Sequence, residues 1–209
     1  KSLSSFSKNT KSISEISYLS DYFSGNLSAK ILMNYSAIKE EKIKYNVLGK
    51  ITKFNLINDS NFPIKFKNFN GDLEFKNNLL EINGNVFLNN SKSDINITID
   101  KEYKLLINVN SSALFSSFDF LKDYNFLESG TSKLKLKIEK ENLYYDKWKA
   151  YLSANLYNNH VKINEVVYEK NEKNKGWLDA EFNFENLTLK SVKNLTFITD
   201  DFLIRGDIN

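Results

Sequence analysis

The fold is decided by stretches such as residues 27–37, which read LSAKILMNYSA in one-letter code. The odd positions from Leu27 to Ala37 are all apolar, whereas serine, lysine and asparagine stand between them, with Leu32 as the exception. Side chains of a β-strand point alternately to the two faces of a sheet. The pattern therefore predicts a strand with one buried and one wet face.

The same alternation returns along most of the chain, in short segments bounded by Asn, Asp, Gly or Ser that are typical of hairpin turns. A parallel sheet buried on both faces would show continuous apolar runs instead. We therefore predict a long antiparallel sheet with one apolar face. Its apolar positions include Tyr45, Val47, Leu73, Phe75, Ile82, Val86, Ile95, Ile97, Ile107, Val109, Leu136, Ile138, Ala150, Leu152, Val161, Leu178 and Phe182.

Two stretches depart from the period of two and predict short amphipathic helices, at residues 12–23 and 112–122. Their apolar residues fall three and four positions apart, at Ile13, Ile16, Leu19 and Phe23, and again at Leu114, Phe115, Phe118 and Leu121. We expect each helix to cover one end of the apolar face. A helix that binds a membrane surface or a partner is the less favoured interpretation.

The ends of these two predicted helices resemble each other. Leu19-Ser20-Asp21-Tyr22 is similar to Leu121-Lys122-Asp123-Tyr124, and a glycine and an alternating strand follow each motif. We therefore predict two repeat units, residues 1–110 and 111–209, each a helix followed by sheet, within a fragment of a longer chain. The second unit would carry an additional hairpin near residues 158–176.

The composition argues against several classes of function. The 209 residues carry a net charge of +3, because 29 basic side chains nearly balance 26 acidic ones, which is unlike a nucleic-acid-binding domain. Cysteine is absent, histidine occurs once at His160, and no glycine-rich phosphate-binding motif is present. The adjacent acids Asp200 and Asp201 fit a turn. We therefore expect no enzyme activity, no metal, no cofactor and no nucleic-acid partner, and no apolar run is long enough to predict a transmembrane helix.

The order of elements resembles the AsmA-like superfamily of bacterial envelope proteins, in particular the periplasmic repeat region of its YhdP-type members. The similarity is best from Trp148 to Asn209, where residues 149–156 (KAYLSANL) are followed by residues 161–170 and then by Gly176-Trp177-Leu178-Asp179-Ala180. Residues 69–84 look like an earlier copy of the same unit. The loop at residues 171–175 lacks the Pro-Gly character that such loops often have.

The resemblance implies a sheet curved into an open groove, the "β-taco" shape, that carries phospholipid between the inner and outer membranes in outer-membrane biogenesis. It implies a periplasmic segment of an inner-membrane-anchored protein, with the anchor outside this segment and with possible envelope protein partners. We expect the groove lining to include mid-strand residues of the apolar face, namely Ile31, Met33, Val47, Phe75, Ile82, Ile97, Ile107, Leu136, Leu152, Phe182 and Ile204.

The periodicity leaves open whether this face touches lipid or other side chains. A sheet that curls over its own apolar face would be a sealed sandwich or barrel core. The alternative function is then a structural or adhesive β-repeat module, or an envelope-assembly module, with a sealed apolar core.

Overall fold

A computed structural model describes residues 23–34, 44–56, 67–88, 91–113, 127–130, 132–143, 145–163, 168–186 and 188–209. Strands account for most of these residues, and no helix occurs among them. The prediction of a mostly antiparallel β protein is confirmed. The strands are β1 (Phe23–Asn34), β2 (Lys44–Leu56), β3 (Lys67–Lys76), β4 (Leu79–Leu88), β5 (Ser91–Ile99), β6 (Leu105–Ala113), β7 (Leu127–Gly130), β8 (Ser132–Lys140), β9 (Lys147–Asn155), β10 (Asn159–Ile163), β11 (Tyr168–Lys170), β12 (Gly176–Glu185), β13 (Thr188–Thr199) and β14 (Leu203–Ile208).

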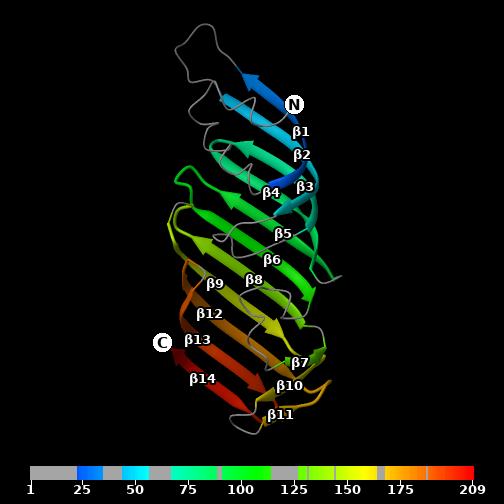
Figure 1. The fold of residues 1–209 in the computed structure, drawn as a ribbon, viewed down its shortest axis with the longest axis vertical. Coiled ribbons are helices and arrows are strands. Elements are labelled where there is room, and N and C mark those ends of the chain that lie inside the picture. The colour runs from blue at the N-terminus through cyan, green and yellow to red at the C-terminus, as the bar shows by residue number, and fades with distance from the viewer. Residues whose placement is uncertain are drawn as a thin grey trace.

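Eleven of these strands form one antiparallel sheet in the order β1-β2-β3-β4-β5-β6-β8-β9-β12-β13-β14. Figure 1 shows them stacked along the long axis of the molecule, with β1 and β14 at opposite ends. The sheet is not closed into a barrel, because β1 does not pair with β14. Ten strand spacings make it about 48 Å long.

The other three strands form a small sheet in the order β11-β10-β7, which Figure 1 shows beside the β14 end of the large sheet. Strands β10 and β11 come from the segment near residues 158–176 that we expected to be an additional hairpin. That segment therefore does form a hairpin, but it lies outside the large sheet.

β-bulges interrupt the regular pairing at both ends of the large sheet. The register shifts between Ile51 and Phe54 where β2 pairs with β3, and between Val192 and Leu195 where β13 pairs with β14. Lys53 and Asn194 have positive φ angles of 52° and 54° at these points. Bulges of this kind increase the local right-handed twist of a sheet.

The predicted helices fall largely outside the described residues, which include neither 1–22 nor 114–126. Where they overlap the structure, the prediction is wrong, since Phe23 begins β1 and Ser112 and Ala113 end β6. Ser112 and Ala113 pair with Lys133 and Ser132 of β8, so sheet pairing takes these residues in place of a helical turn. The predicted division between residues 110 and 111 falls within β6, and the two-unit organisation stays a prediction.

Candidate functional site: the apolar face

The apolar side chains predicted from the alternation lie on one face of the large sheet, which we call the apolar face, except for Val161, which belongs to β10 of the small sheet. Its register can be followed across every strand, because the directly paired residues form a single row. That row consists of Ala29, Gly49, Leu73, Ile82, Ile97, Ile107, Ile138, Ala150, Phe182, Val192 and Ile208. The apolar face is therefore continuous from β1 to β14.

The eleven residues predicted to line a groove all belong to strands of this sheet, but their exposure differs along it. Ile31 in β1 is 50% exposed, and its neighbour Leu27 is 45% exposed. Val47, Phe75, Ile82 and Ile204 are half-buried, and Met33 pairs with Tyr45. The remaining five are buried, with exposed fractions of 9% for Ile97, 2% for Ile107, 1% for Leu136, 2% for Leu152 and 6% for Phe182.

The middle of the apolar face is thus exposed at β1, half-buried at Val47, Phe75 and Ile82 of β2, β3 and β4, and buried from β5 to β12. Ile51, Phe69 and Val86 in β2, β3 and β4 are buried as well. Ile31, Val47 and Phe75 lie side by side in one row at the exposed end. Ile97 and Ile107 form a cross-strand pair in the buried centre. The β1 end therefore offers apolar surface to a ligand without a rearrangement of the protein, whereas the buried centre does not.

The small sheet packs on the apolar face near the β14 end. Tyr168 of β11 stacks on Phe202, with the ring centroids 4.3 Å apart, and meets Phe197 of β13 edge-to-face at 6.1 Å. The Tyr168 hydroxyl donates to Thr199 Oγ1 at 2.6 Å and lies 3.1 Å from Asp201 Oδ1. The desolvation of the phenol raises the pKa of Tyr168 above its usual value.

A buried lysine in β11 also stabilises the small sheet through hydrogen bonds to backbone carbonyl groups. Lys170 is only 1% exposed, and its ammonium group donates to the carbonyl oxygens of Asn159 at 2.9 Å and Asn171 at 3.0 Å. A Cβ atom added at Gly176 would lie 2.6 Å from Lys170 Cε, so the glycine leaves room for the lysine side chain. Burial lowers the pKa of Lys170, because it disfavours the charged form.

Phe69 closes part of the apolar face nearer the exposed end. This ring is 1% exposed and lies over Gly71 and Gly84, which pair across β3 and β4. A Cβ atom added at Gly71 would lie 2.6 Å from Phe69 Cζ, and one added at Gly84 would lie 2.5 Å from the same atom. The two glycines therefore form a recess that the phenylalanine fills.

The opposite face of the sheet is mostly polar, although Leu32, Leu48 and Phe87 on this face are also exposed. Lys137 pairs with Glu139 at 2.6 Å and Lys149 with Glu181 at 3.4 Å. The hydrogen bond with Lys137 lowers the pKa of Glu139. A shallow hollow of about 600 Å³ lies on this face, and its lining includes Lys135, Lys137, Tyr151, Asp179, Glu181 and Asn194. Such a surface does not suit acyl chains, since their burial requires apolar contacts.

His160 and the adjacent acids Asp200 and Asp201, for which we expected no catalytic role, make contacts within and between the sheets. His160 Nε2 lies 2.8 Å from Glu169 Oε1, within the pairing of β10 and β11. Asp200 Oδ2 accepts a hydrogen bond from the Lys175 backbone amide, and Asp201 accepts one from Thr199 Oγ1 in the turn between β13 and β14. Among the described residues, no group of three or more His, Asp or Glu side chains could hold a metal ion.

The sequence interpretation missed Phe69, Tyr168 and Lys170. Phe69 precedes Gly71 by two residues and so lies on the same face of the strand, and an aromatic residue next to a glycine on one face could have indicated this packing. Nothing in the sequence near Lys170 indicates that it is buried.

Comparison of the chain with protein-family models, curated proteins and solved structures finds no match. In the described part of the chain, no helix is long and apolar enough to cross a membrane.

Proposed function

We propose that this chain is a section of a bridge-like phospholipid transporter, with lipid acyl chains held on the exposed end of the apolar face, from β1 to β4. The exposure of Ile31 (50%) and Leu27 (45%) carries this proposal. Leu27 pairs with the buried Ile51, and Ile31 pairs with the half-buried Val47. The exposed side chains at β1 are therefore apolar like those of the core beside them. Exposed apolar patches of this kind are typical of binding sites.

The energetics of this surface suit lipid. Moving acyl chain from water onto an apolar surface gains about 0.8 kcal/mol per buried CH₂ group, and no bond chemistry or cofactor is needed. A headgroup would remain in solvent beside the sheet. In this proposal the sheet is the wall of an open groove, assembled from repeat units in the periplasm of a Gram-negative envelope and anchored to the inner membrane outside this segment. The resemblance to AsmA-like proteins supports that setting.

One observation favours the alternative, a structural, adhesive or envelope-assembly module with a sealed core. Ile107 and Leu136 are 2% and 1% exposed, so the centre of the face is buried. A lipid path through the whole length of the sheet would require these side chains to become accessible. We therefore place the acyl chains at β1 to β4 and treat the central face as core.

Native mass spectrometry of the purified chain tests the proposal. The proposal expects phospholipid to co-purify and to be displaced by added detergent. A lipid-free species, which also fails to take up phospholipid from vesicles, would support the sealed module. Phe75 is one of the half-buried residues of this surface. Phe75→Asp should lower the lipid content, because a charge there opposes burial of acyl chains.

A further inference from the structure

The shallow hollow on the polar face is a second candidate binding site, on the side of the sheet that faces away from the apolar face. Its lining comes from β6, β8, β9, β12 and β13, which are consecutive in the sheet, so it extends over about 19 Å across the strands. Two rows of directly paired residues form most of it, Asn108-Lys137-Tyr151-Glu181 and Asn110-Lys135-Ser153-Asp179. The elongated shape fits an extended chain better than a small molecule.

The lining of the hollow is rich in hydrogen-bonding groups but carries no net charge. Two lysines, Lys135 and Lys137, balance two carboxylates, Asp179 and Glu181, and asparagine, serine and tyrosine supply the other polar groups. A nucleic acid or another polyanion needs an excess of positive charge on the surface that binds it. The balance here favours an uncharged ligand with many hydroxyl groups.

An exposed indole lies beside the hollow. Trp177 is 41% exposed and precedes Asp179 by two residues in β12, so both side chains point to the polar face. The Trp177 Nε1 atom donates to Asp179 Oδ2 at 2.6 Å, which holds the ring next to the hollow. A sugar ring has C–H groups on its faces and hydroxyl groups around its rim. The face of an aromatic ring suits the former, and carboxylates and amides suit the latter.

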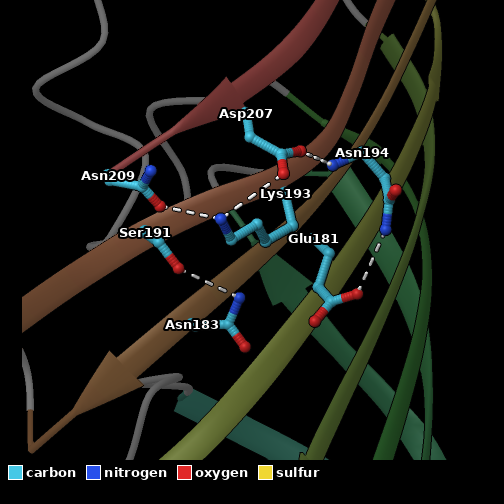
Figure 2. A network of polar contacts seen from close by, with 7 residues as sticks. All are labelled: Glu181, Asn183, Ser191, Lys193, Asn194, Asp207 and Asn209. Atoms are coloured by element: carbon cyan, nitrogen blue, oxygen red, sulfur yellow. Dashed lines mark hydrogen bonds and ion pairs between the residues drawn. The ribbon is translucent and has the colours of Figure 1, made fainter.

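A β-bulge adds a further polar side chain to the hollow. One residue separates Asp179 from Glu181 in β12, whereas two residues, including Asn194, separate their partners in β13. Asn194 has a φ angle of 54°, and its backbone amide donates to Asp207 Oδ1 at 2.9 Å. Figure 2 shows its side chain directed at Glu181, where Asn194 Nδ2 lies 3.5 Å from Oε2. Bulges commonly re-aim a side chain in this way beside functional sites.

Neighbouring side chains hold the polar groups of the hollow in place. Lys137 Nζ lies 2.6 Å from Glu139 Oε1 and 5.5 Å from the centre of the Tyr151 ring. Asn108 Nδ2 donates to Asn96 Oδ1 at 3.3 Å. Groups held in this way lose little conformational entropy when a ligand binds. Because carboxylate and amide oxygens accept more than one hydrogen bond, they can also accept bonds from a ligand.

We propose that this hollow binds an extended, uncharged polysaccharide chain that lies across the strands. The distance between neighbouring strands, about 4.8 Å, is close to the length of one sugar unit in an extended β-linked chain, so each strand can offer its side chains to one unit. The ligand would bind on the face opposite the acyl chains. This inference does not depend on the proposed function, because it uses other residues and another face of the sheet.

Isothermal titration calorimetry with β-linked oligosaccharides tests the proposal. The probes are cellobiose, cellotetraose and cellohexaose, and the N-acetylchitin oligosaccharides of the same lengths. In at least one series the affinity should rise from the disaccharide to the tetrasaccharide and less steeply beyond it, because the hollow spans about five strands. Added salt should leave the affinity unchanged, since the lining has no net charge. Failure of both series to bind would overturn the proposal, as would binding of polygalacturonate alone with a strong dependence on salt.

Two pairs of variants test the location of the site. Asp179→Ala and Trp177→Ala should each weaken hexasaccharide binding about tenfold, because each removes a contact with the sugar and the hydrogen bond that orients the indole. Asp72→Ala, at an exposed position on the polar face of β3, is the control for the first, and Tyr145→Ala, which is 58% exposed, is the control for the second. Melting temperatures confirm that the variants fold. Equal affinities in variants and controls would overturn the proposal.

Discussion

The ring of Tyr168 lies almost parallel to the ring of Phe202, with 14° between the planes, and this stack joins the small sheet to the hairpin between β13 and β14. The same tyrosine places its hydroxyl on Thr199 and Asp201, at the turn of that hairpin. One side chain therefore supplies both an apolar and a polar attachment. Its two contributions can be separated by mutation.

Tyr168→Phe should destabilise the chain by about 1 kcal/mol, because it keeps the ring stack and removes the hydroxyl's hydrogen bonds. Tyr168→Ala should cost about 3 kcal/mol, because the stack and the contact with Phe197 are lost as well. Urea unfolding measures both values. Tyr157→Ala is the control, since Tyr157 is 46% exposed, and it should change stability by less than about 0.5 kcal/mol. Equal effects of the three substitutions would contradict this role for Tyr168.

The buried Lys170 makes stability depend on pH in a direction that the structure specifies. Its pKa is lowered in the folded chain, so the folded chain binds this proton less tightly than the unfolded chain, whose lysine pKa is about 10.5. Its contribution to the free energy of unfolding should therefore rise with pH, from the folded pKa up to about 10.5. The free energy of unfolding of wild type and of Lys170→Met should be measured at pH 7 and at pH 10. The wild type should be more favoured over the variant at pH 10 than at pH 7.

Lys137 provides the control for this pH dependence. Its hydrogen bond with Glu139 raises its pKa above 10.5, so its contribution is fully present below that value and is lost only as the pH rises through the folded pKa. The difference in free energy of unfolding between wild type and Lys137→Met should therefore stay constant from pH 7 to pH 10. A flat result for Lys170 as well would show that its ammonium is not desolvated.

The packing of Phe69 against Gly84 predicts that replacing this glycine lowers the stability of the chain. Gly84→Ala should destabilise the chain by about 2–3 kcal/mol, because the new methyl group meets both the Phe69 ring and the backbone oxygen of Asn70. Gly206→Ala is the matched control, because its Cβ atom enters open space, and it should be neutral or slightly stabilising. Thermal unfolding distinguishes the two, and similar melting temperatures would contradict the packing described here.

Charges at the centre of the apolar face should unfold the chain. Ile97→Asp and Ile107→Lys each place a charge where the side chain is at most 9% exposed, at a cost of several kcal/mol. Thr98→Asp is the control, because Thr98 follows Ile97 in β5 but points to the opposite, polar face. Circular dichroism at increasing temperature measures the effect. Folded variants at both central sites would mean that water reaches this part of the face.

The alternation in the sequence predicted the large sheet well, because a strand's period of two is a local property. Residues 27–34 and 134–138 could be assigned to strands and faces without any knowledge of their partners. The same argument predicted that Ile31 and Ile107 share a face. It could not predict that one is exposed and the other buried, since exposure depends on what packs above the sheet.

The small sheet shows the limit of the local argument most clearly. Three short strands from residues 127–130, 159–163 and 168–170 come together there, and each is too short to give a strong period. The ammonium group of Lys170 is buried because carbonyl oxygens of Asn159 and Asn171 accept its hydrogen bonds and because Gly176 leaves space. No pattern near Lys170 in the sequence indicates this environment.

Acyl-chain binding at the β1 end of the apolar face, as proposed above, can be tested at two adjacent residues. Ile31 and Leu32 are 50% and 44% exposed and point to opposite faces of the sheet. The measurement is the phospholipid content of Ile31→Asp and Leu32→Asp by native mass spectrometry, with melting temperatures recorded for both. We expect Ile31→Asp to lose lipid and Leu32→Asp to keep it, with similar melting temperatures. Equal lipid content in the two variants would argue against acyl-chain binding on this face.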